Sequence, residues 1–120
     1  QNEGLIRCMR SINRLAVQVK NHKIDEADIQ DYMITGKTSL PDDYKELMDQ
    51  EINSFVNKVY RYLNECGYNL DMIPVYFVGG GAIVMKNFGK NQSNFHYVLD
   101  VKSNAKGFEK MARLALNSGR

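Results

Sequence analysis

The sequence has few of the residues that build metal centres and disulfide frameworks. Its 120 residues include two cysteines, Cys8 and Cys66, and two histidines, His22 and His96. The cysteines lie far apart and form no CxxC or mixed cysteine and histidine cluster, which argues against a zinc site and against a disulfide framework. We expect both cysteines to be reduced and to pack in the interior. We expect no metal-binding or catalytic role for either histidine.

The sequence also lacks an excess of charge of one sign, and it lacks long hydrophobic runs. The formal net charge is +2 and the basic residues are scattered, so bulk electrostatics give no reason to expect direct binding to nucleic acid or membranes. No apolar segment approaches the length of a membrane span, and residues 1–4 show neither a signal peptide nor an initiator methionine. The composition, 43% hydrophobic and 25% charged, is that of an ordinary globular domain. We predict a cytoplasmic protein and expect the chain to be an excised piece of a longer one.

Helical patterns fill the first half of the chain. One apolar stripe, made by Leu5, Met9, Ile12, Ala16 and Val19, predicts a first helix that ends near His22. A short second helix should begin after Asp25, which suits an N-cap, and end at Gly36. After Pro41, apolar residues recur at helical spacing as far as Cys66, just before Gly67, and predict one long helix over residues 42–66.

The most informative stretch is residues 74–82, Pro-Val-Tyr-Phe-Val-Gly-Gly-Gly-Ala. Its four large apolar residues are typical of a parallel strand covered on both faces. Gly79, Gly80 and Gly81 then remove side-chain bulk, permit positive φ and let backbone approach a ligand closely, which favours a nucleotide site. A tight strand-to-helix turn without a ligand explains the same glycines. The spacing matches neither the dinucleotide fingerprint nor the P-loop.

The rest of the chain completes an α/β pattern with too few strands. We predict a helix over residues 82–88 ended by Gly89, a strand over residues 95–99, and a last helix from Ser103 or Asn104 through Leu116. Two strands cannot bury a parallel strand on both faces, and a two-stranded sheet is marginal alone. Further strands must therefore come from a missing part of the same protein or from another subunit.

These elements resemble the C-terminal half of an actin-like ATPase of the ParM/StbA plasmid-segregation type, within the superfamily of actin, Hsp70 and sugar kinases. Residues 75–82 resemble the adenosine motif of that superfamily, and the long helix before them is similar to the helix that precedes the motif. Residues 104–108 resemble the start of the family's closing helix. Gly4, Leu5 and residues 7–19 are similar to the first helix of the upper lobe on the C-terminal side.

The resemblance implies a fold and a division of the chain. Residues 1–41 would belong to a small helical subdomain, and residues 42–73 would form a long connecting helix and linker. Residues 74–120 would be the C-terminal part of a ribonuclease H-like nucleotide-binding subdomain. The whole protein would have two lobes around a cleft that holds ATP and Mg²⁺, with GTP as the alternative nucleotide.

The resemblance also implies which residues contact the nucleotide. Gly79, Gly80 and Gly81 would lie against the ribose and α-phosphate, and Arg10 and Arg14 on the first helix would stack on or border the adenine. A solvated face is the alternative explanation of these arginines. The superfamily's two phosphate-binding turns contain Asp-x-Gly, which this sequence lacks. We therefore expect no catalytic residue, no metal ligand and no hydrolysis by this segment alone.

Membership of this family would imply self-association into filaments, driven by ATP, and a DNA-bound adaptor protein as the second partner. Two alternatives stay open. The chain could belong to another member of the superfamily, such as a sugar or acetate kinase or an Hsp70-like ATPase. It could also be a non-enzymatic helical adaptor that dimerises through its helices, with the glycines serving as a turn.

Overall fold

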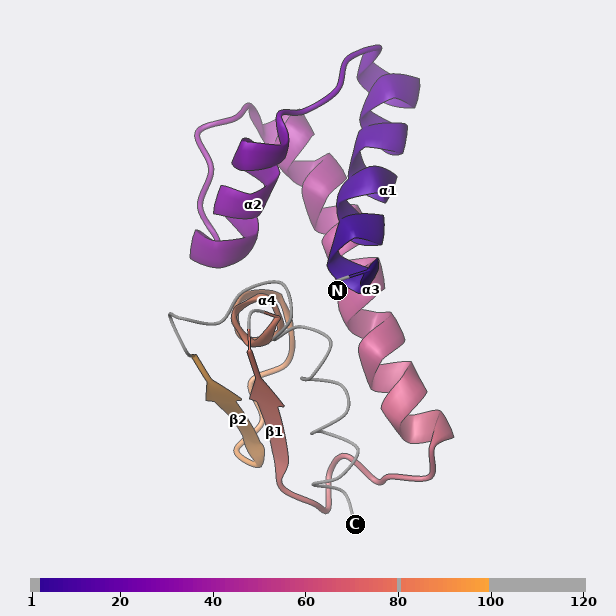
Figure 1. Cartoon of the computed structure of the whole chain (residues 1–120), viewed down its shortest axis with the longest axis vertical. Coiled ribbons are helices and arrows are strands. Elements are labelled where there is room, and N and C mark those ends of the chain that lie inside the picture. The colour runs from indigo at the N-terminus through magenta and orange to yellow at the C-terminus, as the bar shows by residue number, and fades with distance from the viewer. Residues whose placement is uncertain (1–2, 80, 100–120) are drawn as a thin grey trace.

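The computed structural model describes residues 3–79 and 81–99 (Figure 1). Its elements in chain order are α1 (Glu3–Lys20), α2 (Glu26–Thr35), α3 (Asp42–Glu65), β1 (Val75–Val78), α4 (Ala82–Phe88) and β2 (Phe95–Val98). This order and these bounds confirm the α/β pattern predicted for the described residues. The last helix, predicted from Ser103 or Asn104 to Leu116, lies outside them.

Glycines end α2, α3 and α4 as predicted, and two of them have a positive φ. Gly36 follows α2 with a φ of 73°, and its N–H donates to the carbonyl of Tyr32 over 2.7 Å. Gly67 follows α3 and its cap residue with a φ of 97°. Both values lie in the region that glycine adopts without the steric cost of a Cβ atom. Asp25 occupies the N-cap position of α2, as predicted, but its side chain makes no capping hydrogen bond.

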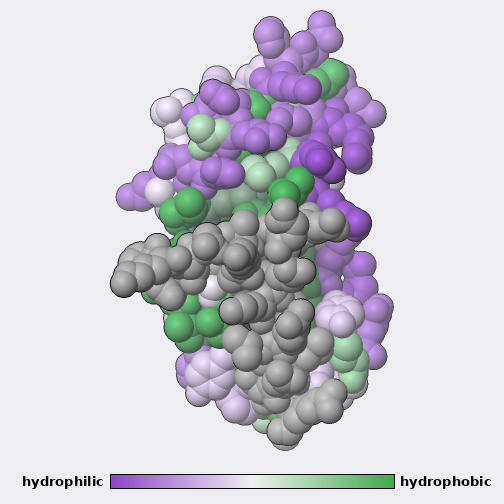
Figure 2. Space-filling model, in the orientation of Figure 1, coloured by the Kyte–Doolittle hydropathy of each residue, from purple (hydrophilic) through white to green (hydrophobic). Residues whose placement is uncertain are grey.

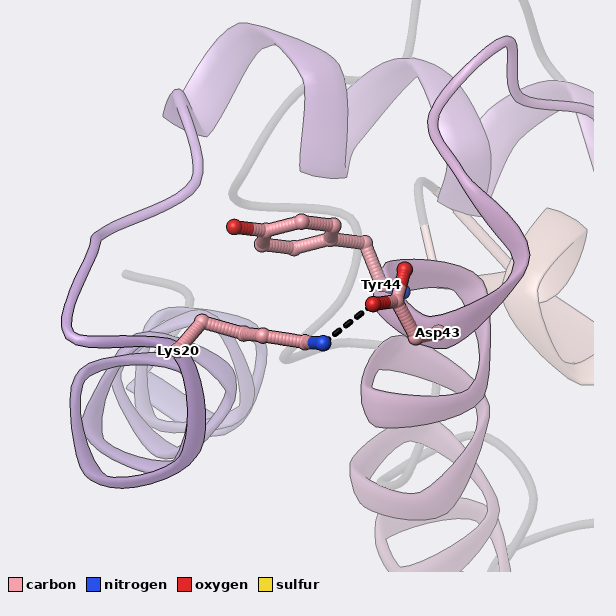
Figure 3. A network of polar contacts seen from close by, with 3 residues as sticks. All are labelled: Lys20, Asp43 and Tyr44. Atoms are coloured by element: carbon pink, nitrogen blue, oxygen red, sulfur yellow. Dashed lines mark hydrogen bonds and ion pairs between the residues drawn. The ribbon is translucent and has the colours of Figure 1, made fainter.

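Helix α1 packs along α3 through most of the predicted stripe. Met9, Ile12 and Ala16 are buried, whereas Val19 is 57% exposed, so the prediction for the end of the stripe is wrong. The last turn of α1 meets α3 through Lys20, whose ammonium pairs with the Asp43 carboxylate and lies 5.6 Å from the Tyr44 ring centroid (Figure 3). The hydrogen bond from Lys20 lowers the pKa of Asp43.

Strands β1 and β2 run parallel, with Val75 opposite Phe95 and Val78 opposite Val98. One face of this sheet is in the core, since Val75, Phe77 and Phe95 are buried. On the other face Tyr76 is 43% exposed and stacks on the ring of His96. The prediction that β1 is buried on both faces is therefore wrong for this structure, because the elements that pack on β1 within the described residues leave Tyr76 in contact with solvent.

Tyr60 links the long helix to the sheet. Its ring stacks on Phe95 at 5.7 Å and meets Phe77 edge-on at 6.4 Å between centroids. Its hydroxyl oxygen accepts the N–H of Lys90 over 2.9 Å, just after α4. A second link joins α4 to α2, because Asn87 Nδ2 donates to the carbonyls at the end of α2. These contacts hold the helices and the parallel pair together as one small α/β unit.

Exposed apolar side chains occur on the helices as well as on the sheet. In Figure 2, hydrophilic residues cover most of the upper part of the molecule, where α1 and α2 lie in Figure 1. Exposed apolar side chains on and beside the sheet include Tyr76, Val98 and Leu99. Within residues 3–79 and 81–99, no helix combines the length and the hydrophobicity that crossing a bilayer requires.

Candidate functional site

The glycine turn between β1 and α4 is the site that the sequence singles out. Gly79 follows β1 with a φ of 93°, a conformation that L-residues rarely adopt. Gly81 has an ordinary φ of −76° and precedes the first residue of α4. The N–H of Ala82 donates to the carbonyl of Gly79 over 3.1 Å, and that of Met85 donates to the carbonyl of Gly81 over 3.1 Å. Gly80 lies outside the described residues.

Different physical reasons favour glycine at positions 79 and 81. Gly79 needs its positive φ, because a Cβ atom there would cost about 1–2 kcal/mol in backbone strain. Gly81 has a φ open to any residue, so only limited space at this position would require glycine. Both glycines are buried, so their backbone is covered rather than open to solvent in this structure.

Within the described residues, Arg10 and Arg14 do not interact with the glycine turn. Both side chains are exposed on α1, whose principal packing partner is α3. Within the described part of the chain, no hydrogen bond or ion pair joins either guanidinium to the turn between β1 and α4. The structure brings Gly79 and Gly81 together and leaves the two arginines on a solvated face.

The described residues contain no cluster of metal-ligating side chains. No group of three or more His, Cys, Asp or Glu side chains gathers in this part of the molecule as a metal site would require. The sequence also lacks the Asp-x-Gly turns that would contact phosphates.

A second feature, missed by the sequence reasoning, is a cavity of about 310 Å³ between α1, α3 and β1. Its apolar side includes Cys8, Leu63 and Phe77, all of which are buried. Arg7, Glu51 and Lys58 also line it and give it a polar side. The sequence did contain one signal for this cavity. Besides the residues that pack in the core, the long helix has another set at helical spacing, namely Glu51, Phe55, Lys58 and Tyr62.

Cys8 is an inert thiol at this cavity, whereas Cys66 is accessible. Burial, and then the charge of Glu51, raise the pKa of Cys8 to about 12, so the reactive thiolate is scarce at neutral pH. Its Sγ lies 3.8 Å from the carbonyl oxygen of Glu51. The prediction of a buried, reduced cysteine is confirmed for Cys8. It is wrong for Cys66, which is exposed because it caps the end of α3.

Comparisons with protein-family models, with curated proteins and with solved structures give no match for this chain.

Proposed function

We propose that this chain is the C-terminal part of a cytoplasmic, actin-like ATPase that forms filaments and acts in plasmid or DNA segregation. In this proposal the segment supplies the adenosine side of an ATP site. The phosphate-binding turns and the ligands of Mg²⁺ belong to the other part of the protein. The segment alone then binds nucleotide weakly and does not hydrolyse it, because phosphoryl transfer depends on positioned phosphates and metal.

The observation that carries the proposal is the unit formed by β1, the glycine turn, α4 and β2. A parallel pair joined through a helix needs a crossover, and nucleotides bind beside the carboxyl ends of parallel strands in many α/β proteins. Here the carboxyl end of β1 is followed at once by Gly79, whose positive φ is rarely adopted by residues that have a side chain. Three glycines in a row at this end of a strand favour close approach of a ligand to the backbone.

The long helix fits the same proposal. Helix α3 begins beside the end of α1 and reaches the sheet through Tyr60, so it spans from the helical part to the nucleotide-binding part. A connecting element of this kind could transmit movement between the two parts when the nucleotide changes. Arg10 and Arg14 are solvent-facing, so their contact with adenine requires the other lobe or a closed state.

Sedimentation of the full-length protein tests this function. We expect a pellet with ATP and Mg²⁺, less pellet after hydrolysis to ADP, and none without nucleotide. The absence of a polymer under every nucleotide condition would contradict the filament proposal. Turnover of a small acceptor without assembly would instead support a sugar or acetate kinase. Stability and oligomeric state that are indifferent to nucleotide would support a non-enzymatic adaptor.

A further inference from the structure

A small polar cavity lies at the amino ends of the two strands, where the end of α3 meets the segments that lead into β1 and β2. Its volume is about 140 Å³. The glycine turn follows the carboxyl end of β1, so this cavity and the candidate nucleotide site lie at opposite ends of the strand. The polar side chains that line the cavity are Asn64, Asn69, Asp71, Lys90 and Gln92.

Hydrogen bonds between the segments before β1 and β2 hold the walls of the cavity in place. Asn94 Nδ2 donates to the carbonyls of Leu70 and Ile73 over 2.6 Å each, which ties one segment to the other. Gln92 Nε2 donates to Asp71 Oδ1 over 3.3 Å and to Asn94 Oδ1 over 3.2 Å. A site whose walls are already fixed loses little conformational entropy when a ligand binds.

Two opposite charges line this cavity without pairing with each other. The Lys90 ammonium lies 5.7 Å from the Tyr60 ring centroid, and the face of an aromatic ring attracts a cation. The Asp71 carboxylate accepts a hydrogen bond from Gln92, which is an uncharged amide. Among the described residues, neither Lys90 nor Asp71 takes part in an ion pair. A ligand that carries both charges would therefore complement this cavity.

We propose that the cavity binds a small zwitterion, namely an α-amino acid of the size of alanine. The Lys90 ammonium donates to its carboxylate, and its own ammonium donates to the Asp71 carboxylate. Leu70 and Phe95, both buried, also line the cavity and leave an apolar surface for a methyl side chain. The volume limits the ligand, since about 140 Å³ is well below the roughly 300–1,000 Å³ of sites for drug-sized molecules.

Isothermal titration calorimetry of the full-length protein, without nucleotide, tests the site with L-alanine, propionate and ethylamine. L-alanine should bind with a dissociation constant of about 1 mM or lower. Propionate lacks the ammonium and ethylamine lacks the carboxylate, so each should bind at least tenfold more weakly. A dissociation constant for L-alanine above about 1 mM, or equal affinity for L-alanine and either analogue, would overturn the proposal.

Two variants of the full-length protein assign the charges, and two others serve as controls. Asp71→Asn keeps an oxygen that can accept the bond from Gln92 and should weaken L-alanine at least tenfold while propionate binds unchanged. Lys90→Met should weaken L-alanine to a similar degree while ethylamine binds unchanged. The controls Asp31→Asn and Lys86→Met change exposed residues outside the cavity and should leave the affinity for L-alanine unchanged. Equal effects of the cavity and control variants would show that the ligand binds elsewhere.

The same titrations separate this site from the proposed filament function, on which it does not rest. They use no ATP, so binding of L-alanine by a protein that fails to form polymer would support the amino acid site and reject the filament function alone. Competition provides the remaining check. Displacement of L-alanine by ATP would place the amino acid at the nucleotide site and overturn the proposal, whereas simultaneous binding would support a separate site.

Discussion

A single methyl group added at Gly89, which ends α4, should be costly. Its φ of −97° with a ψ of −168° is open to any residue, so alanine adds no backbone strain. A Cβ atom at this position would overlap Tyr60 Oη and lie 2.5 Å from the carbonyl oxygen of Met85. Neither neighbour is free to move, because Met85 O accepts the N–H of Gly89 and Tyr60 Oη accepts the N–H of Lys90.

The expected cost of Gly89→Ala follows from these contacts. Overpacking of this kind costs about 1–3 kcal/mol, and loss of the Tyr60 to Lys90 hydrogen bond adds about 1 kcal/mol. We therefore expect the free energy of unfolding, measured by urea denaturation, to fall by about 2–4 kcal/mol. A fall below about 0.5 kcal/mol would refute the reasoning, since that is the range of a surface substitution.

A double-mutant cycle locates the collision. Tyr60→Phe alone should cost about 1 kcal/mol, because the N–H of Lys90 loses its acceptor. In the Tyr60→Phe background, Gly89→Ala should cost about 1–2 kcal/mol less than in the wild type, since the hydroxyl that the Cβ would strike is absent. Strictly additive costs would show that the methyl group does not meet Tyr60.

Three further predictions concern thiols, pH and the turn before β1. Ellman's reagent should label Cys66 rapidly and Cys8 only as the protein unfolds; equal rates would contradict the burial of Cys8. Burial raises the pKa of Cys8 and of Tyr97 to about 12, so the unfolded chain loses these protons first and the free energy of unfolding should fall as pH rises above about 9. A urea midpoint that stays constant from pH 8 to pH 11 would contradict this sign. Asn94→Ala should lower the free energy of unfolding by about 1–2 kcal/mol, because Nδ2 of Asn94 donates to two main-chain carbonyls over 2.6 Å each; an unchanged urea midpoint would show that these bonds add nothing.

Local signals made most element bounds predictable from the sequence. Gly36 and Pro41 lie at predicted helix boundaries, where glycine and proline act through the backbone alone. Gly89 also ends its helix as predicted, although its backbone conformation is open to any residue. Burial was less predictable, because it depends on which element covers a face. Val19 continues an apolar stripe yet is exposed beside Lys20, and Tyr76 belongs to an apolar run yet faces solvent.

The candidate site was predictable only as a local motif. Three glycines after a strand permit a positive φ, and Gly79 adopts one. The exposure of Arg10 and Arg14 and the cavity beside Phe77 result from packing between segments far apart in the chain. The link made by Tyr60 is of the same kind, because its partners lie in β1 and β2.

The most direct test of the central claim is the affinity of the full-length protein for ATP with Gly79→Ala or Gly67→Ala. Both glycines have positive φ, and a Cβ at Gly67 meets nothing within 4 Å, so the two variants should carry a similar backbone cost of about 1–2 kcal/mol. If the glycine turn forms one wall of the nucleotide site, Gly79→Ala should weaken ATP binding at least tenfold, about 1.4 kcal/mol, while Gly67→Ala leaves the affinity unchanged. Equal affinities of the two variants and the wild type would contradict the claim.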